Sequence, residues 1–312
     1  MAERDGDGWA LCAQGHQHWG VYGASGLLAV HHDIEGVPHV LMQERSLTSH
    51  YGGTWGLPGG ARDSHEDAVA SALREAYEEA ALGPEGLRVQ GVYLDDHGGW
   101  TFETVIAEAA TLLAASPANA ESTDMRWMPV AEVEARRLHP GFAATWPQVR
   151  LALSPLVIVL DMANIVGARA EHGWWRDRAG ATARLLAEVD TLMGQGFQGV
   201  PLETPPLATW FPRVKAVVEG AARRVLPVGP DTVLEEAGGS ALYQAGMEVV
   251  AAPNSGDDMI VELVAQVPPW ERSLVVTADR GLRERVKALG AEVVGPKWLI
   301  AQIRDLGERG TI

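Results

Sequence analysis

The stretch REAYEEAAL, residues 74–82, places three glutamates on about one turn of an expected helix. Glu75, Glu78 and Glu79 are spaced i, i+3 and i+4, so their side chains share one face of that helix. At this spacing each pair of carboxylates repels by about 3 kcal/mol, for an effective dielectric constant of about 20. The stretch is therefore either a solvated acidic face on a surface helix or a site that holds cations.

The helix that carries these glutamates is well marked in the sequence. Ser64 and Asp67 form the S-x-x-D pattern of a capping box, which predicts that the helix begins there. Alanines fill much of residues 68–81 and raise the helix propensity. Val69 and Leu73 form an inward-facing stripe beside the acidic face.

The residues before the helix extend the pattern, because residues 55–60 read WGLPGG. Together they resemble the Nudix box, G-x5-E-x7-R-E-U-x-E-E-x-G-U, where U is an apolar residue. The matching residues are Gly60, Glu66, Arg74, Glu75, Glu78, Glu79 and Leu82. One position departs from the family, which has glycine where this chain has Ala81. Gly83 is expected to take over the left-handed role at the helix end.

The resemblance implies a fold and a reaction for residues 1–148. The expected fold is a Nudix α/β/α sandwich of α+β type with a mixed sheet. Strand pairs are predicted within residues 23–46, around a turn at 33–36, and within residues 87–109. The implied reaction is hydrolysis of the pyrophosphate bond of a nucleoside diphosphate linked to another group, such as a nucleoside triphosphate or a nucleotide sugar. The implied cofactor is Mg²⁺ or Mn²⁺, which polarises a phosphate and activates water.

The resemblance also assigns roles to residues. Glu75, Glu78 and Glu79 would carry the metal ions, since hard cations prefer carboxylate oxygens. Arg74 would hold a glutamate in place by a charge-assisted hydrogen bond, and Glu66 would support the site from the preceding loop. These five are the predicted catalytic residues of the first domain.

Other residues of this half are candidates for substrate contact. Gly59 and Gly60 are predicted to bind substrate, because a backbone without side chains approaches it closely. Glu103 and Glu121 are candidates for a further metal ligand. Four aromatic side chains are candidates to stack on a base, with ordinary packing as the alternative: Trp19, Tyr22, Trp55 and Trp100.

Three soft donors lie close together near the N-terminus, at Cys12, His16 and His18. A set of three ligands with one cysteine is a poor match to structural zinc, so ordinary surface or strand residues are the preferred interpretation. A single cysteine also excludes an internal disulfide framework and fits a reducing cytoplasm.

A different pattern follows a predicted break at residues 139–155, where prolines bracket a short segment. Short valine-rich runs alternate with helical stretches, which predicts an α/β domain with a doubly wound parallel sheet covered on both faces. The runs are residues 156–161, 216–220, 248–253, 273–279 and 292–295.

Acidic residues stand at or just past the ends of these runs. The carboxyl ends of parallel strands meet at one edge, so the side chains are expected to converge, and converging carboxylates need protons or metal. Helix capping and turn formation are the alternatives for single residues. The acidic residues are Asp161, Glu219, Asp257, Asp258 and Asp279.

The order of the segments DMAN, VVEG, SGDDMI and VTADRGL resembles the PIN-like nuclease superfamily, in particular its NYN (YacP-like) branch. The resemblance covers about residues 155–300. It implies a Mg²⁺- or Mn²⁺-dependent ribonuclease in residues 155–312, with Asn164 and Glu219 contacting substrate. Glu219 is a departure, because many relatives have aspartate there. The metal ligands implied are Asp161, Asp257, Asp258 and Asp279.

The composition limits the partners. The chain of 312 residues suggests two domains, and no apolar run is long enough to span a membrane. The net charge is −16, divided as −12 over residues 1–150 and −4 over residues 151–312. The second half therefore permits single-stranded RNA, for which GWWRDR at 173–178 offers aromatic and arginine side chains. No secretory signal is evident, so a cytoplasmic location is expected.

Three alternatives remain for the chain as a whole. The two domains together form an RNA 5′-end processing protein. The second domain is a non-catalytic module that binds nucleotide or RNA and regulates the first. Or the first domain is a ligand sensor without activity.

Overall fold

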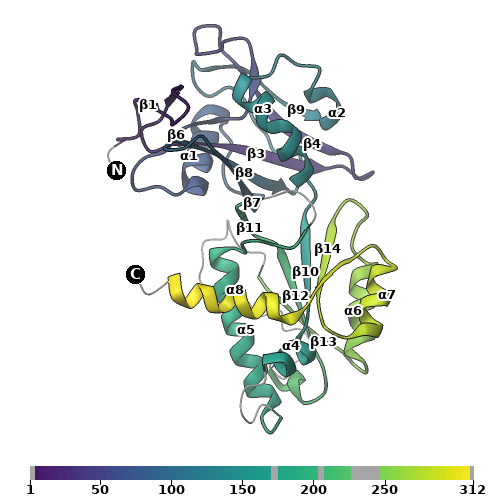
Figure 1. Cartoon of the computed structure of the whole chain (residues 1–312). Helices are drawn as coiled ribbons and strands as arrows, with labels where there is room; N and C mark the ends of the chain where they lie inside the picture. Colours follow the sequence, from purple (N-terminus) through teal and green to yellow (C-terminus); the bar gives the residue numbers. More distant parts are fainter. Residues whose placement is uncertain (1–3, 170–174, 203–206, 226–245, 310–312) are drawn as a thin grey trace. The chain divides into compact units, whose positions relative to one another are not determined.

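The computed structural model describes residues 4–169, 175–202, 207–225 and 246–309 (Figure 1). The chain divides into two compact units, residues 1–153 with 203–210, and residues 154–202 with 211–312. None of the helices in the described part of the chain combines the length and apolarity needed to cross a membrane.

The first unit is built on a mixed sheet in the order β11-β7-β8-β3-β4-β5, with β6 paired to β3 and β9 paired to β4. β3 and β8 are parallel, whereas β3–β4, β7–β8 and β4–β9 are antiparallel, which confirms the mixed sheet. A separate hairpin pairs β1 with β2. The strands are β1 (Trp9–Leu11), β2 (Gln17–Trp19), β3 (Ala24–His32), β4 (Pro38–Arg45), β5 (Trp55–Gly56), β6 (Gly59–Ala61), β7 (Leu87–Asp96), β8 (Thr101–Ala109), β9 (Ser122–Pro129) and β11 (Thr209–Trp210).

The predicted strand pairs of this unit are confirmed as β3–β4 and β7–β8. The apolar residues of β3 and β4 form the core; Leu28, Val30 and Met42 have no solvent exposure. The helices of the unit are α1 (Ala68–Ala80), α2 (Val130–Val133) and α3 (Pro140–Val149), followed by the 3-10 helix η1 (Arg150–Ala152). Helix α1 packs against β3, β6 and β8.

Both ends of α1 differ in detail from the sequence prediction. The helix cap is Asp67, whose side chain accepts a hydrogen bond from the backbone N–H of Ala70. Ser64 instead donates to the carboxylate of Asp5, so no capping box forms. At the other end Ala81 itself adopts the left-handed conformation, with φ 53° and ψ 26°. Gly83 is therefore not the residue that ends the helix.

Strand β11 was not anticipated from the sequence. Residues Thr209 and Trp210 come from the second half of the chain, yet they pair antiparallel with Val92 and Gly91 of β7. Gly91 makes this approach possible, because a Cβ there would lie 2.6 Å from the carbonyl oxygen of Thr209. The predicted break at 139–155 contains α3 and η1, and the division between the units falls after Leu153.

The second unit has a five-stranded sheet in the order β13-β12-β10-β14-β15. Every neighbouring pair is parallel, which confirms the predicted parallel sheet. The strands are β10 (Leu156–Asp161), β12 (Arg213–Val218), β13 (Glu248–Ala251), β14 (Arg272–Val276) and β15 (Glu292–Val294).

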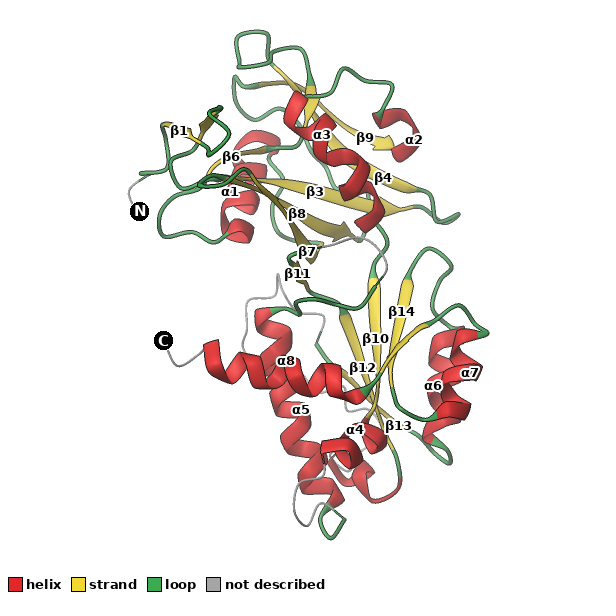
Figure 2. Cartoon of the chain, in the orientation of Figure 1, coloured by secondary structure: helices red, strands yellow, loops and turns green. Residues whose placement is uncertain are grey.

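Helices cover both faces of this sheet (Figure 2). Val157 and Val159 of β10 pack with Ile260 and Leu282 on the side of α6 and α7. Ile158 and Leu160, which alternate with them, are also fully buried, so β10 is apolar on both faces. The helices are α4 (Met162–Arg169), α5 (Arg178–Gln195), η2 (Gly220–Val225), α6 (Gly256–Ala265), α7 (Arg280–Lys287) and α8 (Pro296–Arg309).

Candidate active site

Helix α1 carries Glu75, Glu78 and Glu79 on one face. Glu79 is 2% exposed, and its Oε2 accepts a hydrogen bond of 2.8 Å from the backbone N–H of Gly59. The Glu75 side chain is 13% exposed, whereas Glu78 is more open. Two carboxylates are therefore largely removed from water on one face of a helix, where the electrostatic cost of their charge is high.

Arg74 organises the loop before the helix. Its Nε and Nη2 donate to the two carboxylate oxygens of Glu66 at 2.7 and 2.8 Å, a bidentate pair. Nη1 donates to Glu75 Oε1 at 2.6 Å, and Nη2 also reaches the carbonyl oxygen of Ala61 at 2.9 Å. The guanidinium thus fixes both the loop and Glu75, and it holds the pKa of the Glu66 carboxyl below its usual range.

Burial has the opposite effect on the two inner glutamates. Burial raises the pKa of Glu79 to about 7, with a smaller contribution from the charge of Glu75. Burial also raises the pKa of Glu75, although the hydrogen bond from Arg74 opposes it. A divalent cation would favour the charged form of both groups, because it replaces lost hydration with direct carboxylate coordination. The donor set is all oxygen, which fits Mg²⁺ or Mn²⁺.

Gly59 and Gly60 also have a packing role, and their predicted contact with substrate stays a prediction. Gly59 lies against β3, where a Cβ would come within 2.5 Å of the carbonyl oxygen of Ser25. A Cβ on Gly60 would lie 2.7 and 2.9 Å from the two carboxylate oxygens of Glu75. Gly59 is thus required for strand packing, and a side chain at Gly60 would displace the Glu75 carboxylate.

A second arginine side chain, that of Arg4, contacts the glutamates of α1. The guanidinium of Arg4 forms an ion pair with Glu78, and Arg74 Nη1 lies 3.7 Å from the other oxygen of the same carboxylate. Arg4 is held nearby because the backbone N–H groups of Asp5 and Gly6 both donate to Asp63 Oδ1. No sequence pattern indicates this role for Arg4, which lies 74 positions from its partner.

The other predicted contact residues separate into two groups. Trp55 and Trp100 are buried, and Trp100 donates its indole N–H to the carbonyl oxygen of Gly20, so both are packing residues. Trp19 and Tyr22 are exposed.

The two candidates for a further metal ligand also differ. Glu103 forms an ion pair with Arg62 at 2.7 Å. Glu121 is exposed, and its charge contributes to raising the pKa of Glu79.

Comparison with known proteins identifies the first unit. The NUDIX domain model matches residues 27–148. A protein of Mycobacterium tuberculosis named "Putative 8-oxo-dGTP diphosphatase 3" is 49% identical over 154 residues, covering 47% of this chain and 70% of that protein. The chain belongs to the Nudix family. Its first unit is a Nudix-type pyrophosphohydrolase.

Two further similarities involve Nudix proteins. A "Nucleoside triphosphate pyrophosphatase/Nudix hydrolase fusion protein" of Bifidobacterium longum is 43% identical over 155 residues, covering 48% of this chain and 32% of that protein. The crystal structure of a Nudix hydrolase from M. smegmatis, RenU, is 45% identical, covers 46% of this chain and 93% of that chain, and gives a TM-score of 0.43.

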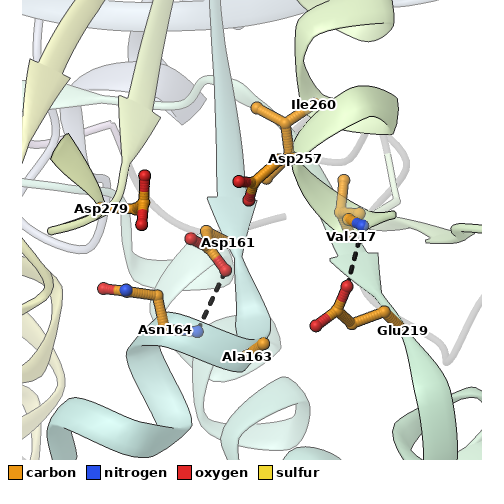
Figure 3. Close-up of a pocket in the computed structure, with 9 residues that line it drawn as sticks. Asp161, Ala163, Asn164, Val217, Glu219, Asp257, Ile260 and Asp279 are labelled. Atoms are coloured by element: carbon orange, nitrogen blue, oxygen red, sulfur yellow. Dashed lines mark hydrogen bonds between the residues drawn. The ribbon is translucent and has the colours of Figure 1, made fainter. Parts of the chain in front are cut away.

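Outside the Nudix unit, the second unit has a cavity of about 280 Å³ at the carboxyl ends of its strands (Figure 3). The side chains that line it come from four separate segments of the chain. They are Asp161, Ala163, Asn164, Val217, Glu219, Gly256, Asp257, Ile260 and Asp279.

Asp161 lines this cavity and is 7% exposed. Its Oδ1 accepts from the backbone N–H of Asn164 at 3.0 Å, and its Oδ2 accepts from the hydroxyl of Thr277 at 2.7 Å. Burial raises the pKa of Asp161 despite these bonds. Asn164 is itself fixed, because its side-chain oxygen accepts from the backbone N–H of Ala278. Thr277 was not singled out from the sequence, since a threonine at a strand end carries no distinctive signal.

Two of the remaining acids of the cavity, Glu219 and Asp279, accept hydrogen bonds from backbone N–H groups. Glu219 accepts from the N–H of Gly256 at 2.8 Å (Figure 3), and Asp279 caps α7 through the N–H of Leu282. Asp257 also lines the cavity. Burial, together with the charges of Asp279 and Glu219, raises the pKa of its carboxyl group. Several acidic side chains therefore line one cavity, as expected where the carboxyl ends of parallel strands converge.

Asp258 does not join this cluster. Its carboxylate pairs with Arg285 at 2.6 Å and is absent from the cavity lining. Adjacent positions on a helix point about 100° apart, which is consistent with Asp257 lining the cavity and Asp258 pairing outside it. Of the segment 173–178, residues 173 and 174 lie outside the described residues, and Trp175 is exposed.

Proposed function

We propose that the Nudix unit hydrolyses the pyrophosphate bond of a nucleoside triphosphate, with an oxidised guanine nucleotide as the first substrate to test. The name of the M. tuberculosis relative supports this choice. The observation that carries the proposal is the buried carboxylate of Glu79 beside the Glu75 side chain, which is 13% exposed, next to the more open Glu78. Burial raises the pKa of both carboxyl groups, and a divalent cation would offset the cost of their charge there.

Glu75, Glu78 and Glu79 would hold Mg²⁺ or Mn²⁺, which when bound polarises the bridging phosphate and lowers the pKa of a water. Arg74 and Glu66 orient Glu75 and the loop, so that the carboxylates keep their positions during the reaction. The exposed Trp19 and Tyr22 are available to the base, whereas the buried Trp55 and Trp100 are not.

The test is release of phosphate products from a nucleotide panel with Mg²⁺, identified by mass. The panel contains canonical and oxidised nucleoside triphosphates, ADP-ribose, a nucleotide sugar and dinucleoside polyphosphates. Wild type is compared with Glu79→Gln, and with Glu35→Gln as the matched control on the exposed turn after β3. Loss of turnover in Glu79→Gln alone supports the assignment, whereas equal turnover in all three proteins refutes it.

We propose a second activity for the other unit, metal-dependent cleavage of single-stranded RNA, with the fold and motif order of the PIN-like NYN branch. Support comes from the cavity lined by Asp161, Glu219, Asp257 and Asp279. These carboxylates would hold Mg²⁺ or Mn²⁺, which when bound stabilises the attacking water and the leaving oxygen. Asn164 holds the loop after β14 through Ala278, so its role is positional as well as polar.

The chain offers a matched pair for testing this activity. Asp161→Asn removes a charge inside the cavity, whereas Asp258→Asn removes one that pairs with Arg285 outside it. End-labelled single-stranded RNA is incubated with the full chain and Mn²⁺. Cleavage by wild type and Asp258→Asn but not by Asp161→Asn supports a nuclease. RNA that is bound and never cut refutes it in favour of a regulatory module.

A further inference from the structure

The β1–β2 hairpin and the loop between β7 and β8 bring together three side chains with nitrogen or sulfur donor atoms. Cys12, His18 and His97 each offer a ligand atom, and these atoms all lie within 4.8 Å of one another. Cys12 and His18 belong to the first hairpin, and His97 is about 80 residues away in the sequence. This cluster is made of a thiol and two imidazoles and is separate from the glutamates of α1.

Two of these donors are buried without satisfied hydrogen bonds. Within the described residues, neither Nε2 of His18 nor Nδ1 of His97 has a hydrogen-bond partner, and both atoms are inaccessible to solvent. Cys12 is 5% exposed. A buried imidazole nitrogen without a partner costs free energy, so such atoms are rare unless they bind something.

The hydrogen bond of the other ring nitrogen, Nε2, indicates which tautomer His97 adopts. His97 Nε2 lies 3.0 Å from Asp95 Oδ2, and a carboxylate there favours a proton on Nε2. Nδ1 then carries the free lone pair that a metal ion needs. A carboxylate behind a histidine is the usual support of a metal-binding imidazole, because it orients the ring and raises its basicity.

The ring of His18 is also held in place. It stacks on Trp100 with centroids 4.0 Å apart and an interplanar angle of 12°, and it lies 4.7 Å from the ring of His97. Trp100 is anchored by its hydrogen bond to Gly20.

The backbone joins the two loops independently of the side chains. The N–H of Ala13 donates to the carbonyl oxygen of Gly98 at 2.7 Å, and the N–H of Cys12 donates to the carbonyl oxygen of His16 at 3.0 Å. Gly98 in turn donates to Asp96. The donors are therefore placed by the fold itself, which lowers the entropy lost on binding.

We propose that Cys12, His18 and His97 bind a Zn²⁺ ion, with Asp95 as the supporting carboxylate and a water in the fourth position. One thiolate and two neutral imidazoles suit zinc and disfavour Mg²⁺, which prefers oxygen. The thiolate and the Asp95 carboxylate together balance the charge of the ion. Binding releases the proton of the Cys12 thiol. The ion clamps the β1–β2 hairpin, which carries the exposed Trp9 and Trp19, onto the loop after β7.

The test uses the full chain, stripped with a chelator and then titrated with Co²⁺ in excess Mg²⁺. Cobalt bound to a thiolate gives a charge-transfer band that carboxylate sites do not produce, so the readout separates the cluster from the Nudix glutamates. We expect the band to saturate at about one equivalent in wild type. Zinc retained after dialysis, measured by elemental analysis, gives the same stoichiometry.

Variants assign the ligands. Cys12→Ser and His97→Ala are expected to lose the band, and Asp95→Asn to weaken Zn²⁺ affinity by about 10- to 100-fold. His16→Ala is the matched control, because His16 is exposed and outside the cluster. Absence of the band in wild type, or its survival in Cys12→Ser, overturns the proposal. Its loss in His16→Ala with retention in His97→Ala overturns the assignment of His97.

Discussion

Removing the charge of Glu79 is expected to stabilise the metal-free Nudix unit at neutral and alkaline pH. Glu79 is 2% exposed and its pKa is about 7, against an ordinary value of 4.5. The folded state thus holds this proton to higher pH than the unfolded state does. Between pH 4.5 and 7 the unfolded state binds fewer protons, so wild-type stability falls as pH rises through that window.

The change in the free energy of unfolding follows from the raised pKa of Glu79. A displacement of about 2.5 pKa units corresponds to about 3 kcal/mol, fully expressed above pH 7 and absent below about pH 4.5. Glu79→Gln keeps the size of the side chain and an oxygen to accept from the N–H of Gly59. The variant should therefore be more stable than wild type by up to about 3 kcal/mol at pH 8 and about equal to it at pH 4.5.

The assay is denaturant unfolding in a chelator at several pH values, repeated with Mg²⁺. Mg²⁺ should stabilise wild type at pH 8 by RT ln(1 + [Mg²⁺]/Kd), and it should stabilise Glu79→Gln much less. Glu35→Gln controls for loss of a surface charge and should stay within about 0.5 kcal/mol of wild type. A Glu79→Gln protein that is less stable than wild type at pH 8 without metal would contradict the reasoning.

Three further outcomes are expected. Ala81→Gly should stabilise the protein by about 1 kcal/mol in thermal unfolding, because Ala81 is held at φ 53°; unchanged stability would show that the helix end is unstrained. Gly60→Ala should lower kcat by about a hundredfold with an intact fold by circular dichroism, since its Cβ displaces the Glu75 carboxylate; full activity would refute this steric role. His139→Phe should reduce acid sensitivity. Burial lowers the pKa of His139 to about 4. The free energy of unfolding of wild type therefore falls by up to about 3 kcal/mol as the pH falls from 6.5 to 4. Equal pH profiles of unfolding for wild type and His139→Phe would exclude His139 as the cause.

Local patterns predicted a large part of the structure. The alanine-rich stretch with three glutamates indicated α1, and the valine-rich runs indicated the parallel strands of the second unit, because both depend on neighbouring residues. The acids after these runs meet at one cavity because parallel strands end at one edge. Asp258 stands on the same segment, but its carboxylate pairs with Arg285 and does not line the cavity.

Local sequence patterns do not predict contacts between residues that lie far apart in the chain. Arg4 reaches Glu78, and His97 joins Cys12, across loops whose paths the sequence does not specify. The role of Gly60 was also missed, because the need for a missing side chain depends on where Glu75 points. Each of these features became visible only when the tertiary packing placed the partners together.

The pairing of β11 with β7 has a practical consequence for dividing the protein. A fragment that ends after residue 153 would leave the backbone groups of β7 unpaired along a sheet edge, which invites aggregation. A fragment that starts at residue 154 would carry Leu207 and Trp210, both buried in the intact chain, without their partner strand. Two such fragments expressed together should associate through this strand, so the chain is suited to a split-protein reporter and poorly suited to separate study of its halves.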